Sequence, residues 1–485
     1  MIVAYNLSLS SSVAFFAGIS VSSAFQTSLM NQAFLDYYRC PEMYGEFCLQ
    51  GKPSSPAGYF RFGLGAIGFG QLSSGACAAT VSGQLYDAMQ GVKISQSTPS
   101  LPFDPTRVVD NLRFERYVNG NASGKWKRRT KAMLEDAYYS VRPSLPIFVR
   151  KFIQQGTLHG WDRKPFPEWP VDHSVEQFFK KLLALSMKAK DVDRLPFIWF
   201  WPEGYSGCAI MTHDVETSLG LSFISSLMDI EDSHGVKSSF QIIPEKRYQA
   251  PQSLLNQIRT RGCEVNVHDL NHDGHLFRER SEFVRRVKKI NNYRREFGAL
   301  GFRSGVLYRN LDWYDDLEFA YDMSVPNVGH LDPQPGGCCT VMPYFIGKIL
   351  ELPLTTIQDY SLFHILGDYS VELWKKQIAL ILGENGLLSF NIHPDYVIPQ
   401  KARGVYIKLL EYLSALRSKT NLWMALPGQV DRWWRKRAEM KLVTQGQTWV
   451  IEGPGKERAR IAYAVLKGDE VRYSLPEKIA EVPAV

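Results

Sequence analysis

Polar residues able to do chemistry follow several apolar runs that the sequence predicts to be buried strands. His213 and Asp214 follow CAIMT, His268 follows CEVNV, Arg303 follows ALGF, and His393 follows LLSFNI. Acids and imidazoles are costly to bury unless they are paired, hydrogen-bonded or bound to a metal. Because the carboxyl ends of parallel strands face the binding crevice in α/β folds, these positions indicate an active site.

A second stretch, HDLNHDGH from His268 to His275, suggests a metal site. His268 and His272 are four residues apart, a spacing that lets two imidazoles converge on one cation from a helical turn. Zinc would take both nitrogens and a carboxylate oxygen, and would leave one position open for water. We expect His275 to be an ordinary surface histidine beyond this turn.

The elements that must position these residues alternate from about Pro196 onward. Short apolar runs such as CAIMTH, SSFQIIP, CEVNVH and LLSFNIH alternate with amphipathic helical patterns such as SFISSLMDIEDSHG and SEFVRRVKKINNYRREFG. Several of the helical patterns end in Gly, the usual residue of a left-handed C-cap. This repetition predicts a parallel α/β sheet or barrel.

A chain of 485 residues is too long to fold around one compact core, and changes in composition along it suggest four regions. Residues 1–95 are rich in Ser, Gly and Ala and have no assigned role. We expect residues 96–199 to form a helical, basic and aromatic region that packs on the α/β sheet or barrel. Residues 200–440 carry the α/β pattern, and residues 441–485 read as a small antiparallel β appendage.

Composition and charge exclude several classes. The net charge of +7 is a mild basic bias, concentrated at residues 125–131 and 283–296. The second cluster has helical spacing, which favours a solvated helix face, although anionic glycans or lipid headgroups could bind either cluster. We find no nucleic-acid module, dinucleotide fingerprint, Walker motif or serine nucleophile elbow.

The cysteines and the N-terminal segment give an expectation about where in the cell the protein is found. The seven cysteines form no disulfide framework, which fits a reducing compartment. The mildly apolar run at 11–25 has no basic residue before it and is too short to span a membrane. We therefore expect a cytoplasmic protein without a membrane span; the sequence does not indicate the oligomeric state.

Taken together, these motifs resemble the polysaccharide deacetylases, carbohydrate esterases with a NodB-type domain. The resemblance covers roughly residues 200–435. Its five motifs align in order: TFDDG with Thr212–Glu216, H(S/T)xxH with His268–His272, an Arg after a strand with Arg303, an Asp/Trp motif loosely with Asp312 and Trp313, and a strand ending in His with Leu388–His393.

This resemblance implies a distorted (β/α) barrel that hydrolyses an N- or O-acetyl group on a sugar. From the composition we expect a mainly helical or irregular N-terminal extension beside it. It implies that Asp214 is the general base, that Arg303 holds Asp214 ionised, and that His393 is the general acid. The implied cofactor is a divalent metal, with Zn²⁺ the expected ion, which would polarise the carbonyl.

One departure concerns the metal ligands. The family's second Asp normally ligates the metal, but Val215 occupies that position here. In an extended segment Asp214 and Glu216 point to the same side, so Glu216 could complete the set with His268 and His272. The alternatives are Asp214 itself, His213, or no third protein ligand.

Four further residues are candidate substrate contacts: Asp359, Tyr308, Trp313 and His213. Asp359 follows another strand-like run and could equally be a turn or cap residue, Tyr308 could lie on a surface loop, and Trp313 could belong to the core.

The sequence therefore predicts a metal-dependent deacetylase acting on an acetylated sugar or glycan precursor. Two alternatives stay open. One is a metal-dependent hydrolase of a non-sugar C–N bond; the other is a carbohydrate-binding relative that has lost turnover.

Overall fold

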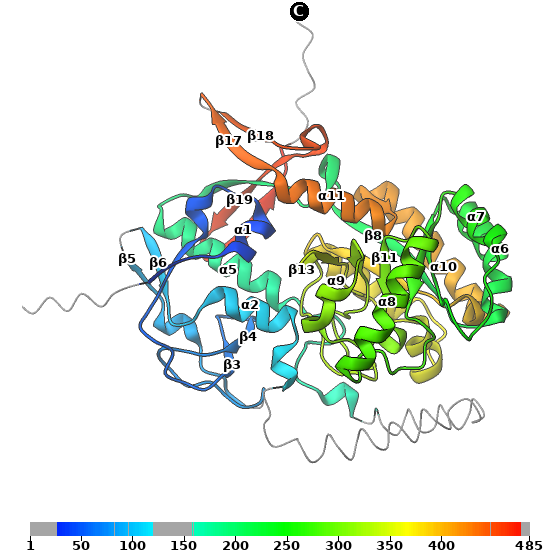
Figure 1. Ribbon diagram of the computed structural model, residues 1–485. Helices are drawn as coiled ribbons and strands as arrows, with labels where there is room; N and C mark the ends of the chain where they lie inside the picture. Colours follow the sequence, from blue (N-terminus) through cyan, green and yellow to red (C-terminus); the bar gives the residue numbers. More distant parts are fainter. Residues whose placement is uncertain are drawn as a thin grey trace, which may run out of the picture.

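The computed structural model describes residues 27–81, 83–95, 97–119, 158, 160–446 and 448–476. Figure 1 shows the N-terminal region and the α/β region side by side, with the last strands (orange to red) along the top of the N-terminal region. The apolar run at 11–25 and the basic cluster at 125–131 lie outside the described residues. What we expected of those two segments therefore stays a prediction.

Seven of the eight parallel strands of the α/β region follow one another across its central sheet. In their spatial order from β8 they are β8 (Gly207–Val215), β9 (Ser238–Ile242), β10 (Glu264–His268), β11 (Gly301–Arg303), β12 (Tyr321–Asp322) and β14 (Ile349–Glu351), with β15 (Leu387–Asn391) on the other side of β8. The register pairs His268 with Arg303 and Thr212 with Asn391. Polar strand ends thus lie next to one another.

The sheet curls toward closure between β14 and β15. The chain after β14 reaches β15, where Thr355 Oγ1 donates to the carbonyl of Leu387 at 2.6 Å. The backbone N–H of Thr356 donates to the carbonyl of Ser389 at 3.3 Å. β13 (Tyr344–Ile346) adds an antiparallel edge to β14, and β16 (Leu422–Ala425) adds to β8. The result is the distorted (β/α) barrel that the sequence predicted.

Helices cover the outer face of this sheet and bury one continuous apolar core against it. They are α6 (Ser218–Ser233), α7 (Gln252–Thr260), α8 (Arg280–Glu296), α9 (Glu372–Gly383) and α10 (Gln400–Thr420). α6 begins directly after the strand end of interest, because the side chain of Thr217 caps it by accepting from Gly220 N at 3.0 Å. β8 therefore leads from a buried strand straight into a helix.

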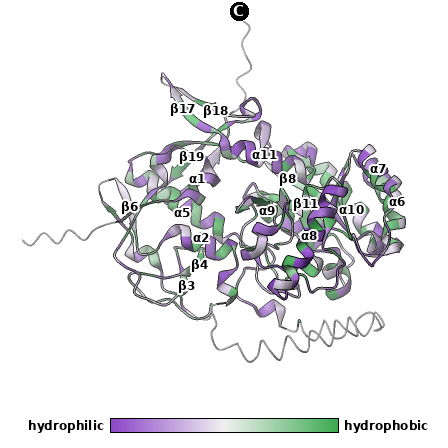
Figure 2. Ribbon diagram, in the orientation of Figure 1, coloured by the Kyte–Doolittle hydropathy of each residue, from purple (hydrophilic) through white to green (hydrophobic). Residues whose placement is uncertain are grey.

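The basic cluster at 283–296 is the hydrophilic side of α8 (Figure 2). Arg285 pairs with Glu282 at 2.6 Å and Lys289 with Glu245 at 3.1 Å, all at the surface. This arrangement agrees with the predicted solvated helix face.

The N-terminal region differs from the predicted irregular or helical extension. Its described part contains six short strands and two helices: β1 (Thr27–Met30), α1 (Gln32–Tyr38), β2 (Glu46–Leu49), β3 (Gly58–Arg61), β4 (Ile67–Gly70), β5 (Lys93–Ser95), β6 (Thr98–Leu101) and α2 (Pro105–Arg113). Strands of three or four residues are too short to show an alternating pattern, and glycines interrupt them. Within the described residues, the next long helix is α5 (Ser174–Ala189), whose amphipathic period the sequence did show.

The C-terminal strands are β-structure, as expected, but they do not stand apart. β17 (Lys441–Gln445) and β18 (Thr448–Glu452) form a hairpin after α11 (Pro427–Glu439). β19 (Ile461–Lys467) pairs both with β20 (Glu470–Ser474) and with β7 (Arg194–Ile198), the strand that precedes the barrel. Because β7 completes this sheet, the appendage belongs to the body of the protein.

A second core joins these outer regions to the barrel. It combines apolar residues of the N-terminal region, α5, β7, α11 and β19 with interior residues of the barrel strands such as Cys208 and Ile210. A buried ion pair also connects the N-terminal region to the barrel, because Arg309 Nε donates to Glu115 Oε2 at 2.7 Å. The barrel and its neighbours therefore share one packed interior.

Two observations bear on location. All seven cysteines are free thiols. Within the described part of the chain, each helix is too short or too polar to cross a membrane.

Candidate metal centre

The alternation of β8 decides which side chains enter the barrel. Thr212 and Asp214 face the interior, where both contact Arg303. His213 faces outward, where its Nδ1 lies 3.0 Å from the carbonyl of Ile392 and its Nε2 lies 2.6 Å from Glu231 Oε1. Glu216, two residues beyond Asp214, lies on the same side as Asp214.

Asp214 is buried and held at both oxygens. Arg303 Nη1 donates to Oδ1 at 3.0 Å, and Asn391 Nδ2 donates to Oδ2 at 2.8 Å. Arg303 is fixed in turn, because its Nε donates to the carbonyl of Met323 at 2.9 Å. Burial raises the pKa of Asp214, but the cationic Arg303 and the nearby imidazoles outweigh it and hold the pKa below its ordinary value.

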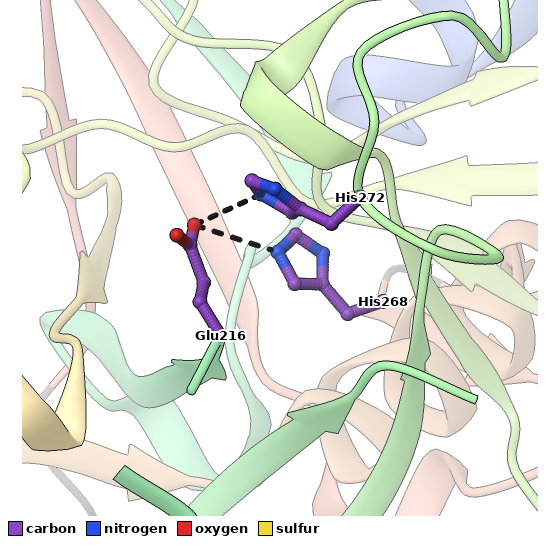
Figure 3. A group of neighbouring side chains, drawn as sticks. All are labelled: Glu216, His268 and His272. Carbon is purple, nitrogen blue, oxygen red and sulfur yellow. Dashed lines mark ion pairs between the residues drawn. The ribbon is translucent and has the colours of Figure 1, made fainter. Parts of the chain in front are cut away.

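Glu216, His268 and His272 converge at the carboxyl end of the barrel (Figure 3). Glu216 Oε1 lies 2.9 Å from His272 Nε2 and 3.9 Å from His268 Nε2. Burial raises the pKa of Glu216, but His272, His268 and His393 together hold it well below its ordinary value. The carboxylate is therefore ionised where two imidazole nitrogens face it.

The segment that carries the two histidines is an irregular turn rather than the predicted helical turn. Asp269 and His272 both have φ of +54°, in the left-handed region that few non-glycine residues adopt. Gly305 lets this turn approach, since a Cβ there would lie 2.4 Å from Asp269 Oδ2. The turn brings the two imidazole rings to a centroid distance of 4.8 Å.

These residues fit a metal ion. His268 Nδ1 donates to the carbonyl of Arg303 at 3.0 Å, which leaves its Nε2 lone pair toward Glu216. The Nε2 atoms of His268 and His272 are both buried and make no hydrogen bond of regular geometry, although Glu216 Oε1 lies 2.9 Å from that of His272. Two imidazoles and one carboxylate, with ligand atoms within 4.8 Å of one another, are a donor set that zinc prefers.

His393 lies on the other side of Glu216, with its Nε2 3.4 Å from Glu216 Oε1. Its Nδ1–H donates to Asp359 Oδ1 at 2.7 Å, and its backbone N–H donates to Asp359 Oδ2 at 2.8 Å. Burial lowers the pKa of His393, but Asp359 and Glu216 outweigh it and raise the pKa well above its ordinary value. The two carboxylates thus favour the protonated form of the His393 imidazole beside the candidate metal ligands.

The four predicted substrate contacts lie in different environments. Asp359 is fully buried against His393, so it positions that imidazole instead of lining the crevice. His213 points to the outer face, so it neither joins the metal ligands nor faces the crevice. Trp313 packs against Phe283 of α8 at 5.3 Å between ring centroids, which places it in the helical layer. Tyr308 is half-buried in the loop after Arg303, and its contact with substrate stays a prediction.

Asn391 is a site residue that the sequence reading missed. Its Nδ2 donates to Asp214 and, at 3.1 Å, to Gln358 Oε1. The signal was present, because Asn391 is two residues before His393 in an extended segment and so shares its side of the strand.

The site opens to solvent at Glu216, whose side chain is 20% exposed. A separate cavity of about 200 Å³ lies between α11 and the loop before β19, lined by residues such as Trp423, Arg432 and Lys436. None of the site residues borders that cavity, so the chemistry is assigned to the converging side chains.

Comparison with known proteins gives structural likenesses alone. No protein-family model matches the sequence, and no curated protein matches it. A polysaccharide deacetylase structure from Mycobacterium smegmatis is 16% identical, with a TM-score of 0.41, over 52% of this chain and 98% of that one. An allantoinase structure is 12% identical, with a TM-score of 0.40, over 48% and 92%. Peptidoglycan deacetylase PdaC from Bacillus subtilis is 11% identical, with a TM-score of 0.33, over 49% and 95%.

Polysaccharide deacetylases, which the sequence motifs resemble, are thus among the similar structures. The identities and TM-scores are low, so the function is inferred below from the geometry of the site itself.

Proposed function

We propose that this protein is a metal-dependent hydrolase that removes an acetyl group from a carbohydrate or glycan precursor. One observation carries the proposal: Glu216, His268 and His272 converge between the carboxylate of Asp214 and the imidazole of His393. A base, a metal site and an acid in one group can together catalyse hydrolysis of an unactivated amide or ester.

The three converging side chains would hold a divalent metal, and their chemistry favours Zn²⁺. When bound, such an ion polarises the acyl carbonyl and lowers the pKa of bound water.

Asp214 would act as the base. Arg303 and Asn391 hold its carboxylate in one orientation, with Oδ2 3.8 Å from His268 Nε2. From that position Asp214 takes one proton from the attacking water as the water oxygen bonds to the acyl carbon.

His393 would act as the acid. Its hydrogen bond to Asp359 directs Nδ1 away, and its Nε2 faces the centre. Nε2 gives its proton to the departing nitrogen or oxygen as the bond from the acyl carbon to that atom breaks. The products are acetate and a free amine or hydroxyl.

The test combines metal content with acetate release in the wild type, Glu216→Ala and Asp214→Asn, with Glu411→Ala on the surface of α10 as the control. We expect Glu216→Ala to lose the metal, and Asp214→Asn to keep it while losing acetate release by about 10²-fold or more. Glu411→Ala should match the wild type.

Other results would point elsewhere. Metal loss in Asp214→Asn with retention in Glu216→Ala would make Asp214 the carboxylate ligand. Acetate release from small amides but not from sugars would favour a non-sugar C–N hydrolase. Metal retention with no release from any acetylated compound would favour a carbohydrate-binding protein. We also propose the cytoplasm as its location, because free thiols are typical of a reducing compartment.

A further inference from the structure

Three half-buried aromatic side chains gather beside His393, and the proposed chemistry does not use them. The ring of Tyr396 lies 4.8 Å from that of His393 between centroids, tilted by 38°. Tyr396 also lies 4.9 Å from His364 and 5.6 Å from Tyr360, and the last two rings are 5.5 Å apart. We name Tyr360, His364 and Tyr396 the aromatic wall.

Two separate turns build the aromatic wall. His364 comes from a π-helical turn, η10 (Ser361–Ile365), and Tyr360 is the N-cap residue of that turn; the backbone N–H of Leu366 donates to the carbonyl of Ser361 at 2.9 Å. Tyr396 comes from η11 (Pro394–Val397), directly after His393. π-Helical turns are rare and occur frequently at functional sites, which makes this geometry informative.

The aromatic wall is connected to His393, the proposed acid, through neighbouring residues in the sequence. Asp359, which holds His393 Nδ1, is the residue before Tyr360. One short segment therefore both orients the imidazole and supplies two rings beside it.

The position of His393 indicates what the wall would contact. In the proposed reaction the acetyl group lies at the metal ligands, while His393 protonates the atom that departs. The remainder of the substrate is attached to that departing atom, so it must lie next to His393. Tyr396 is the aromatic ring in contact with this imidazole on its own turn.

We propose that Tyr360, His364 and Tyr396 form a subsite for the sugar ring of the leaving group. This inference rests on the proposed function and adds how the substrate is recognised: a pyranose whose axial hydrogens leave one apolar face. Such a face packs on aromatic rings, while its hydroxyls stay hydrated at the half-exposed edge of the site.

The test compares a sugar with a ring-free acetamide. Acetate release is measured with the N-acetylglucosamine tetramer and with N-acetylethanolamine, for the wild type, Tyr360→Leu and Tyr396→Leu. Tyr412→Leu, a half-buried tyrosine on α10 that lies beneath Lys375, is the matched control. We expect each wall variant to lower kcat/KM for the tetramer by about tenfold, chiefly through KM. For N-acetylethanolamine the decrease should be smaller, and Tyr412→Leu should match the wild type.

Two outcomes separate the subsite from the proposed function. If the wild type releases acetate and Tyr360→Leu behaves like Tyr412→Leu on the tetramer, the subsite is wrong while the function stands. Tyr360→Leu is decisive here because Tyr396→Leu could also move His393. If the wild type releases no acetate from either compound, the function fails, and calorimetric binding of the tetramer then tests the wall. Equal affinity for wild type and Tyr360→Leu, or no binding by either, would overturn it.

Discussion

One oxygen of Glu216 faces the imidazoles of both His272 and His393: Oε1 lies 2.9 Å from Nε2 of the first and 3.4 Å from Nε2 of the second. A single carboxylate therefore connects the candidate metal ligands to the candidate acid. Its negative charge suits a cation on one side and a protonated imidazole on the other.

Metal binding should stabilise the fold through Glu216. A ligand that binds only the native state adds about 2.7 kcal/mol of stability at a free concentration about 100 times its Kd. We expect Zn²⁺ to raise the Tm of the wild type relative to protein in a chelator, and to raise the Tm of Glu216→Ala much less. Thermal unfolding with and without the metal measures this difference. An equal rise in both proteins would place the metal elsewhere.

Asp359→Asn should shift the pH profile. Burial lowers the pKa of His393, but the Asp359 carboxylate outweighs burial, so removing its charge lowers that pKa. The acid form then disappears at lower pH, and the alkaline limb of kcat/KM moves to lower pH. At pH 8 we expect a loss of about tenfold or more, up to the 10²–10⁴-fold that general acids contribute. Glu372→Gln, an exposed change on α9, is the control; an unmoved alkaline limb in Asp359→Asn would contradict the assigned role.

Gly305→Ala should disturb the metal site without altering any ligand. The added Cβ would lie 2.4 Å from Asp269 Oδ2 and 3.1 Å from His272 Cδ2, so the turn that carries His272 must shift. We expect zinc affinity to fall by about tenfold or more, measured by calorimetry. The matched control is Gly404→Ala in α10. There the added Cβ would have no atom within 4 Å apart from its chain neighbours and the backbone of its own helix, so the change should stabilise the helix by up to about 1 kcal/mol. Unchanged zinc affinity in Gly305→Ala would show that His272 can shift freely.

Glu115→Gln should destabilise the whole protein, because it leaves the Arg309 guanidinium buried without its counter-charge. Glu115 also accepts from the backbone N–H of Gly337, so it joins the N-terminal region to the barrel loops. Breaking a buried pair in this way costs about 3–5 kcal/mol. Arg458→Gln, which breaks the exposed pair with Glu203, should cost less than about 1 kcal/mol. Urea unfolding measures the free energy of unfolding of both variants. A similar decrease in both would argue against a stabilising role for the buried Glu115–Arg309 pair.

Glu176→Gln should flatten the dependence of stability on pH. Burial raises the pKa of Glu176 to about 8, despite its hydrogen bond from Thr340, while the unfolded chain titrates near 4.5. The folded protein therefore binds this proton more tightly, and stability falls as pH rises from about 5 to about 8, by up to about 1.4 kcal/mol per pH unit. Unfolding midpoints at pH 6 and pH 9 should differ less in Glu176→Gln than in the wild type. Glu296→Gln, exposed at the end of α8, should keep the wild-type slope; an unchanged slope in Glu176→Gln would contradict the prediction.

The strand ends could be predicted because their signal is local. A buried parallel strand is a short apolar run, and a polar residue directly after it must lie at the carboxyl edge of the sheet. This reasoning located Asp214, His268, Arg303 and His393. The two-residue period of a strand likewise placed Asp214 and Glu216 on one side.

Contacts between distant segments could not be predicted in this way. Asp359 and His393 are separated by 34 residues, and no local pattern states that a turn after one strand reaches the end of the next. The same holds for Glu115 and Arg309, and for β19, which pairs with β7 across most of the chain.

The sequence by itself determined the kinds of group available and the side of each strand on which they lie, because both depend on chain-local chemistry and geometry. Tertiary structure decided which side became the interior. It turned His213 outward to Glu231 and brought Glu216 within reach of three imidazoles. That choice depends on how the whole sheet curls and on what packs against each face, which is a property of all its strands together.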